Sequence, residues 1–242
     1  MPLSDDEVGR YARQLLLPAM GEAGQERLKA ARVRVVGAGP MAGPAILYLA
    51  EAGVGTVWVD DPDPVGPEDA GAWLYAPADL GRPRGPVAAE AARAASALVE
   101  ADILRPGARP TAVLVCPGRQ DVARAVAEEA RLLRLPHVVA EADGEGGSVT
   151  VVPVGAPCYA CAFRAGHGAP PQAAGTAAVG ALAALELVLL VSGASEEPRG
   201  RRTDLVHGQP VTRATARIPG CACGAGATSA PSPSTHGDSA PS

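Results

Sequence analysis

Residues 33–36 read Val-Arg-Val-Val and run directly into Gly37-Ala-Gly39-Pro-Met-Ala42-Gly43. A short apolar strand followed by a Gly-x-Gly-x-x-Ala turn and a helix is typical of a phosphate-binding turn in a dinucleotide-type domain. The first glycine allows the tight turn and the second lets a phosphate approach the backbone, while the N-terminus of the next helix attracts the anion. The stretch therefore predicts a nucleotide beside Gly37, Gly39 and Ala42.

A plain packing turn between a strand and a helix is the alternative interpretation of the same residues. Pro40 and Pro44 lack an amide hydrogen, which removes two donors from a phosphate cradle. Asp61 and Asp63 follow the next apolar stretch, a little beyond the usual spacing for an acid that holds a ribose hydroxyl. These acids favour the nucleotide interpretation.

Strand-like and helix-like stretches alternate on both sides of the turn. This alternation predicts an α/β, Rossmann-like, doubly wound domain with a mostly parallel sheet. The predicted strands are 33–36, 57–60, 111–116, 137–142, 148–152 and 211–217, and the predicted helices are 44–52, 87–99 and 120–134. Ser4 and Glu7 have the spacing of a capping box, so we expect helices in residues 1–32 that pack on a domain over residues 33–224.

Four of the five cysteines form two close pairs, Cys158 with Cys161 and Cys221 with Cys223. Zinc takes four thiolates in a tetrahedron, and a site closed in this way is structural because it leaves no open position for catalysis. Four unrelated thiols are the alternative. We predict a zinc-clipped subregion in the C-terminal part of the domain, with Cys116 left over as a buried core residue.

Composition and charge exclude several classes of function. The net charge is −5, without the basic face of a nucleic-acid-binding protein. The polar, acidic N-terminus does not resemble a secretory signal, so we expect a cytoplasmic protein. Residues 176–193 are apolar enough to imitate a membrane span, but Glu186 lies inside them, and a buried core helix is the better interpretation. Residues 225–242 lack the apolar side chains needed to fold, which predicts a disordered tail.

Several segments match one known family in order along the chain, from about residue 7 to residue 224. They are Arg10-Tyr-Ala-Arg13-Gln14-Leu-Leu-Leu-Pro, Gly21-Glu-Ala-Gly-Gln25-Glu-Arg-Leu-Lys29, the glycine turn, Leu49-Ala-Glu-Ala-Gly53-Val-Gly55, Asp61-Pro-Asp63-Pro-Val65, Pro157-Cys-Tyr-Ala-Cys161 and Glu186. Together they resemble the ThiF/MoeB family, which includes the ubiquitin-activating enzymes.

The resemblance implies a reaction and a set of residues. Such enzymes bind Mg-ATP at the glycine turn, adenylate the C-terminal glycine of a ubiquitin-like protein, often a sulfur carrier, and release pyrophosphate. By resemblance, Arg13 reaches the ATP phosphates of a partner subunit, which implies a homodimer. Asp61 and Asp63 match the ribose-side acids, and Arg84 falls on or near the family lysine.

The match fails at two charged positions of the implied site. The family arginine in the pattern Ser-Asn-Leu-x-Arg-Gln falls near Ala72, and the family aspartate after the fourth strand falls near Gly118. Each lost charge costs roughly 10² to 10³ in rate. We therefore expect impaired adenylation, unless Asp121, Glu141 or Asp143 has moved into the magnesium position.

Three functions remain open from the sequence. The first is an adenylyltransferase that retains activity, and the second is a non-catalytic relative that binds a carrier protein, a peptide or a partner enzyme. The third is a nicotinamide-type oxidoreductase, which explains the glycine turn but neither the Arg10–Gln14 entry helix nor the paired cysteines.

Overall fold

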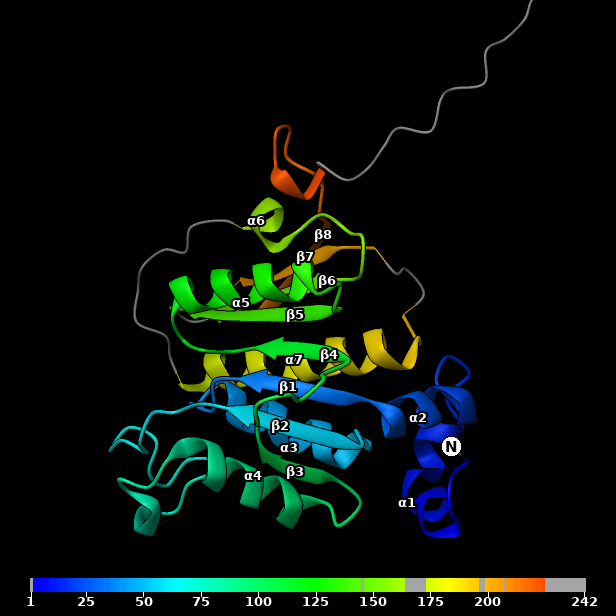
Figure 1. The fold of residues 1–242 in the computed structure, drawn as a ribbon, viewed down its shortest axis with the longest axis vertical. Helices are drawn as coiled ribbons and strands as arrows, with labels where there is room; N and C mark the ends of the chain where they lie inside the picture. Colours follow the sequence, from blue (N-terminus) through cyan, green and yellow to red (C-terminus); the bar gives the residue numbers. More distant parts are fainter. Residues whose placement is uncertain (1, 145, 164–172, 196–198, 207, 225–242) are drawn as a thin grey trace, which may run out of the picture.

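An eight-stranded sheet runs through the protein, with its strands in the order β3-β2-β1-β4-β5-β6-β7-β8 (Figure 1). The structure is a computed structural model that describes residues 2–144, 146–163, 173–195, 199–206 and 208–224. The predicted tail, residues 225–242, lies outside the described residues. The strands are β1 (Arg32–Val36), β2 (Thr56–Asp60), β3 (Glu100–Ile103), β4 (Ala112–Val115), β5 (His137–Asp143), β6 (Gly146–Val152), β7 (Arg201–Val206) and β8 (Gln209–Ala214).

The sheet has a parallel part and an antiparallel part. β1 to β5 pair in parallel, whereas β6, β7 and β8 each run antiparallel to the preceding neighbour. β4, at the centre, is apolar and buried along its whole length, as expected for a strand of a parallel sheet covered by helices on both sides. The predicted Rossmann-like architecture is confirmed, and the antiparallel strands extend it on the side of β5.

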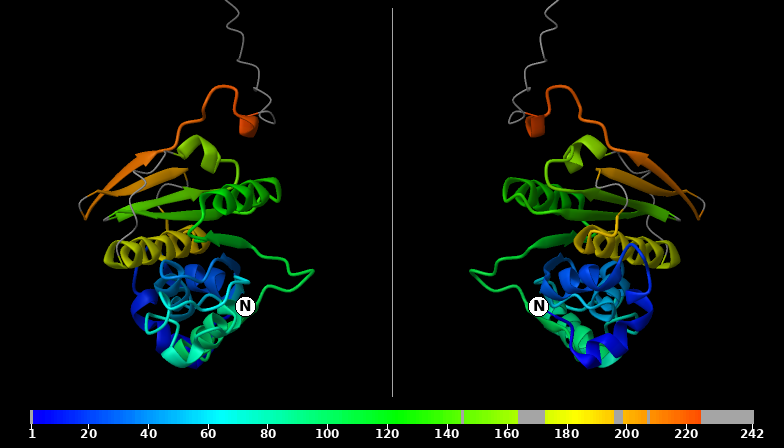
Figure 2. Two further views of the ribbon diagram at one scale, coloured as in Figure 1. Left: turned by 90° about the vertical axis from the view of Figure 1, so that its left-hand side faces the viewer. Right: turned by 90° about the vertical axis from the view of Figure 1, so that its right-hand side faces the viewer.

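Helices cover both faces of the sheet (Figure 2). One face carries α3 (Ala42–Ala52), α4 (Arg84–Ala95) and α7 (Ala173–Ser192), and the other carries α5 (Gln120–Leu132) and the short α6 (Tyr159–Ala162). The short 3₁₀ helices η1 (Pro77–Asp79) and η2 (Ala222–Gly224) lie in the connection before α4 and after β8. Two separate apolar cores follow, one on each face.

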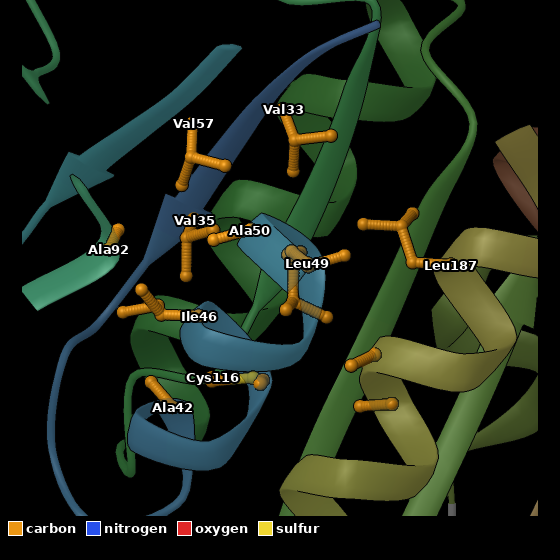
Figure 3. Packing of buried hydrophobic residues seen from close by; sticks show 14 of the residues in the cluster. Val33, Val35, Ala42, Ile46, Leu49, Ala50, Val57, Ala92, Cys116 and Leu187 are labelled. Carbon is orange, nitrogen blue, oxygen red and sulfur yellow. The ribbon is translucent and has the colours of Figure 1, made fainter. Parts of the chain in front are cut away.

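The larger core lies between the sheet and α3, α4 and α7 (Figure 3). Val33 and Val35 of β1 point into it because alternate residues of a strand face the same side. Ile46 and Leu49 of α3 and Leu187 of α7 are fully buried among them. This packing fixes the N-terminus of α3, and with it the turn that joins β1 to α3.

α7 is, among the described residues, the one helix long and apolar enough to cross a membrane. It packs instead against α2 (Gly21–Ala30), α3, β5 and β6, and its residues Val179, Ala183 and Leu187 are buried in the larger core. Glu186 forms an ion pair with Arg201 of β7. The predicted position of this segment in the core is confirmed.

The helix predicted over residues 87–99 is wrong at both ends. α4 begins at Arg84, directly after Pro83, and ends at Ala95, where Ser96 adopts an extended conformation. Residues 100–103 form β3 instead, which pairs with β2 at the edge of the sheet. The structure also adds β7, which the sequence analysis does not predict.

The N-terminal helices lie at the end of the sheet opposite to the glycine turn (Figure 1). α1 (Asp5–Leu15) begins with the predicted capping box, in which the Ser4 amide donates to Glu7 Oε2 at 2.6 Å. Glu7 also pairs with Lys29 of α2 at 2.6 Å. The parallel strands start on this side of the molecule and end on the other, so α1 and the glycine turn are separated by the length of β1.

Candidate nucleotide site and metal centre

The sheet has a topological switch point between the neighbouring strands β1 and β4. From β1 the chain adds β2 and β3 on one side, and it then returns to add β4 and β5 on the other. Ligands of open α/β sheets bind in the crevice outside the carboxyl ends of the strands at such a point. The glycine turn, residues 37–43, follows β1 there, and Cys116 follows β4 beside it.

The first two glycines of the turn have different surroundings. Gly37 has a φ of +90°, and a Cβ added to it would overlap the carbonyl of Cys116. A Cβ added to Gly39 would have no other atom within 4 Å. Gly37 is therefore needed to build the turn, whereas Gly39 leaves open space next to the backbone.

Several backbone amides of the turn are already used. The amides of Ala42 and Gly43 both donate to the Gly39 carbonyl, at 3.0 and 3.1 Å. Pro40 has no amide hydrogen. A phosphate at this turn would therefore depend more on side chains than in a turn with free amides.

Asp61 and Asp63 lie beside the turn but make different contacts. Asp61 accepts the Ala38 amide through Oδ2 at 2.7 Å and the Asp63 amide through Oδ1 at 2.9 Å. Its side chain is 7% exposed, whereas that of Asp63 is 70% exposed. Asp61 thus braces the turn, and Asp63 is the acid that is accessible to a ligand.

Arg84, the first residue of α4, is surrounded by acids. Its Nε donates to Asp69 Oδ2 at 2.8 Å, and its Nη2 forms a second hydrogen bond with the same oxygen. Three more carboxylates lie at 3.6–4.0 Å from its guanidinium nitrogens, those of Asp61, Asp63 and Glu68. The cation that the resemblance places at the phosphates is therefore held beside the glycine turn and paired with Asp69.

Asp69 is a site residue that the sequence analysis missed. Counted back from Ala72, it stands at the asparagine of the family pattern Ser-Asn-Leu-x-Arg-Gln. Its side chain is fully buried, and its Oδ1 has no hydrogen-bond partner among the described residues. The change from an amide to a carboxylate was visible in the sequence, but its pairing with Arg84 was not.

A narrow cleft lies between the glycine turn and the connection that follows β2. It is too narrow to admit a water molecule, and it is lined by Gly39, Pro40, Gly43, Asp69 and residues 72–75. Pockets for drug-sized ligands have about 300–1,000 Å³. A larger cavity of about 260 Å³ lies away from the turn, beside Arg34 and α5, but the strand topology places the site at the glycine turn.

The remaining candidate carboxylates have other partners. Asp121 pairs with Arg119 at 2.7 Å, and this contact holds the pKa of the Asp121 carboxyl below its usual value. Glu141 of β5 lies 3.6 Å from Arg202 of β7. The carboxylates beside the glycine turn include those of Asp61 and Asp63, which were named from the sequence, and that of Asp69, which was not.

Arg13 and Cys116 are placed clearly by the structure. Arg13 is exposed on α1, and α1 lies at the end of the sheet opposite to the turn that joins β1 to α3 (Figure 1). Cys116 is 3% exposed, and burial raises the pKa of its thiol to about 12. Cys116 is therefore a core residue beneath the turn, as predicted, and is unsuited to act as a nucleophile.

The four paired cysteines meet in one cluster. Cys158 precedes α6 and Cys161 lies within it, while Cys221 and Cys223 lie at η2. Their sulfur atoms all lie within 4.8 Å of one another, with Sγ–Sγ distances of 3.8 Å for Cys158–Cys161 and 3.6 Å for Cys158–Cys221 and Cys161–Cys223. A tetrahedron with metal–sulfur bonds of about 2.3 Å has edges of about 3.8 Å. The cluster could therefore hold a metal ion.

Comparisons with known proteins agree with this geometry. The ThiF family matches residues 11–225. MOCS3 of Bos taurus, named an adenylyltransferase and sulfurtransferase, is 34% identical over 251 aligned positions that cover 92% of this chain and 54% of MOCS3. MoeZ of Mycobacterium tuberculosis is 56% identical over 63 residues, which cover 26% of this chain and 16% of MoeZ.

A solved structure shows the same fold. The E. coli MccB structure with MccA has a TM-score of 0.77 at 17% identity, and the match covers 92% of this chain and 75% of MccB. At this identity the likeness concerns the fold alone. The chain spans about half the length of MOCS3, so the activity of the whole relative does not carry over directly.

Proposed function

We propose, because the chain belongs to the ThiF family, that it transfers the adenylyl group of ATP to the terminal carboxylate of a small carrier protein or peptide. The observation that carries the proposal is the glycine turn at the β1–β4 switch point, with Arg84 and Asp63 beside it. The names of the relatives and the MccA peptide in the MccB structure support a carrier or peptide as acceptor.

The residues at the turn fit a nucleotide in part. The open space at Gly39 allows a phosphate to approach the backbone, and Asp63 is accessible to a ribose hydroxyl. In the proposed reaction the acceptor carboxylate attacks the α-phosphorus, the bond to the β-phosphate oxygen breaks, and pyrophosphate leaves. Arg84 is the side chain placed to neutralise charge that develops on the phosphates.

A non-catalytic protein that binds a carrier or peptide is the second candidate. It is favoured by Ala72 and Gly118, which stand where the family has an arginine and an aspartate, and by the pairing of Arg84 with Asp69. The nicotinamide oxidoreductase has no such support, because the ThiF match over residues 11–225 includes most of the Arg10–Gln14 stretch and all four paired cysteines.

ATP–pyrophosphate exchange separates the two candidates. The assay uses the full chain, Mg²⁺ and C-terminal peptides of candidate carriers that end in glycine, with the same peptides amidated at the carboxyl end as the control. We expect exchange with the free carboxylate and none with the amide. No exchange with any acceptor, together with nucleotide binding by calorimetry, would leave the binding protein as the function.

We propose zinc as the ion of the cysteine cluster. Four thiolates at tetrahedral spacing suit Zn²⁺ and leave no position for a substrate. The site lies at η2 and α6, away from the glycine turn (Figure 1). Its proposed role is to join the chain after β8 to α6, which packs on α5 and β6.

We also propose a homodimer in which Arg13 serves the partner's site. Arg13 lies at the opposite end of the sheet from Gly37, so within one chain it does not reach the glycine turn. A second copy is required to bring it there. This follows the resemblance to the family and explains why an exposed arginine at this position would affect the reaction.

Mixing two inactive variants tests this arrangement. Arg13→Ala lacks the donated arginine, and Gly39→Ala has a blocked glycine turn. A heterodimer of the two has one intact site, so random mixing after dissociation should restore about a quarter of the exchange activity of the wild type. Each variant alone should show little exchange. An inactive mixture, with heterodimers confirmed by native mass spectrometry, would contradict the donation of Arg13 between subunits.

A further inference from the structure

Residues 66–76, which we call the crossover segment, contact the glycine turn at two positions and α4 at a third. The Tyr75 hydroxyl donates to the Ala38 carbonyl at 2.6 Å. The Cβ of Trp73 lies 2.8 Å from the position of a Cβ added to Gly43. Asp69 pairs with Arg84. The segment and the glycine turn together thus line the narrow cleft.

The conformation at Trp73 shows that this contact is specific. Trp73 has a φ of +49°, in the left-handed region that bulky residues rarely adopt. Its side chain is 56% exposed, so burial of the ring does not explain the conformation. Such a backbone persists where neighbouring contacts impose it. Here the Tyr75 amide donates to the Ala72 carbonyl at 3.1 Å and the Gly71 amide donates to the Tyr75 carbonyl at 2.8 Å, so Trp73 lies inside a tight hydrogen-bonded turn.

Asp69 is the contact with the strongest electrostatic consequence. Its Oδ2 accepts the Gly66 amide at 2.9 Å in addition to the two hydrogen bonds from Arg84. Its Oδ1 has no hydrogen-bond partner among the described residues, and Asp69 lines the cleft together with Gly39. The buried Asp69 carboxylate therefore both pairs with the cation and lines the narrow cleft at the glycine turn.

We propose that Asp69 takes the place of a nucleotide phosphate on Arg84, so that the crossover segment closes the site until a phosphate displaces it. The proposal rests on the proposed function, and it assigns a regulation to the same site. The Asp69 carboxylate and a phosphate of the ligand then compete for the same guanidinium, that of Arg84.

Charge explains why the two anions exclude each other. Arg84 already faces the carboxylates of Asp61, Asp63, Glu68 and Asp69. A phosphate added beside a buried Asp69 would be repelled at short range, where the surrounding protein screens poorly. Asp69 must therefore leave when the phosphate binds. Trp73 and Tyr75 lie within six residues of Asp69, so their contacts with Gly43 and Ala38 change with it.

The first experiment measures the segment without any ligand. Hydrogen exchange of the amides in residues 66–76 is compared between the wild type and Asp69→Asn, an isosteric change that removes the charge. We expect exchange about tenfold faster in the variant, because a charge-assisted hydrogen bond becomes a neutral one. Asp102→Asn is the matched control, since Asp102 pairs with Arg105 at 2.6 Å on the surface. Unchanged exchange in Asp69→Asn would overturn the proposal.

A second variant tests the proposal if Asp69→Asn does not fold. Trp73→Gly suits the left-handed backbone and removes the ring from Gly43. It should also accelerate exchange in residues 66–76, while circular dichroism stays that of the wild type. If Asp69→Asn does not fold and a folded Trp73→Gly shows no faster exchange, the segment is not held by these contacts and the proposal fails.

The second experiment measures the competition for Arg84. The chain has two tryptophans, so Trp58→Phe leaves Trp73 as a single fluorescent reporter on the segment. In this background we titrate ATP and, separately, tripolyphosphate. Asp69→Asn should bind both about tenfold more tightly, and the fluorescence of Trp73 should change on binding. Asp102→Asn should change neither affinity.

The two ligands separate failure of this proposal from failure of the proposed function. Tighter tripolyphosphate binding, with no ATP binding by any variant, would leave the competition at Arg84 standing and reject adenylyl transfer. Equal affinities of wild type and Asp69→Asn for tripolyphosphate would overturn the competition, whatever ATP does. ATP exchange in the wild type with no change in Asp69→Asn would do the same while the proposed function stands.

Discussion

Cys161→Ser should remove the bound metal and lower the free energy of unfolding by at least about 4 kcal/mol. Structural zinc sites contribute their binding free energy to folding, and apparent values reach about 10–16 kcal/mol in small zinc domains. We expect the smaller value of about 4 kcal/mol here, because this domain also has its own apolar cores. The cluster only closes the loop of chain from Cys158 to Cys223. Metal content by mass spectrometry and urea unfolding measure the two effects.

Cys116→Ala is the matched control for the loss of a cysteine. Cys116 is also buried, but it lies beneath the glycine turn and outside the cluster. It should keep one zinc per chain and lose about 1 kcal/mol from its small core contact. A chelator added to the wild type should reproduce the Cys161→Ser transition. A wild type that carries no metal after purification with zinc, or a Cys161→Ser variant as stable as Cys116→Ala, would refute the structural site.

Gly37→Ala should destabilise the fold by about 3 kcal/mol, whereas Gly39→Ala should leave it unchanged. At Gly37 the added Cβ meets the Cys116 carbonyl and the φ of +90° is unfavourable for alanine. Left-handed backbone costs roughly 1–2 kcal/mol and forced shifts in a packed site about 1–3 kcal/mol. The melting temperature of Gly37→Ala should fall by about 10 °C.

Gly39→Ala separates the fold from the function. Its Cβ enters open space, so the thermal melt should match the wild type. The same Cβ occupies the path of a phosphate toward the backbone, so ATP binding measured by calorimetry should weaken at least about tenfold. Wild-type affinity in a folded Gly39→Ala would show that the nucleotide binds away from this turn.

The sequence predicts the parts of the fold that have a regular pattern. The strands beside the glycine turn are short apolar runs, and α1 begins with a capping box whose two hydrogen bonds depend on Ser4 and Glu7 alone. The four paired cysteines are recognised from their spacing in the sequence. In each case the deciding residues are close in sequence, so local rules apply.

The parts that were missed depend on distant partners. β3 reads Glu-Ala-Asp-Ile and was not predicted, because the polar residues of an edge strand give a weak signal. β7 carries Arg201 and Arg202, whose charges are matched by Glu186 on α7 and by Asp204 and Glu141 in the sheet. These partners cannot be read from the strand itself.

In the candidate site, too, the features that depend on nearby residues were predicted and those that depend on distant partners were not. Gly37, Gly39, Asp61 and Asp63 are brought to one end of the sheet, as expected when loops follow parallel strands. The pairing of Asp69 with Arg84 spans 15 residues of irregular chain and depends on where that chain folds back. The sequence therefore predicted the position of the site, but not which of its charges are already neutralised.

The separation of α1 from the glycine turn has a consequence for how activity depends on the amount of protein. If each site needs an arginine from a second copy, then a single chain in dilute solution has no complete site. Specific activity would then rise with protein concentration and level off above the dissociation constant of the dimer. The abundance of the protein in the cell would itself set its output, with no effector required.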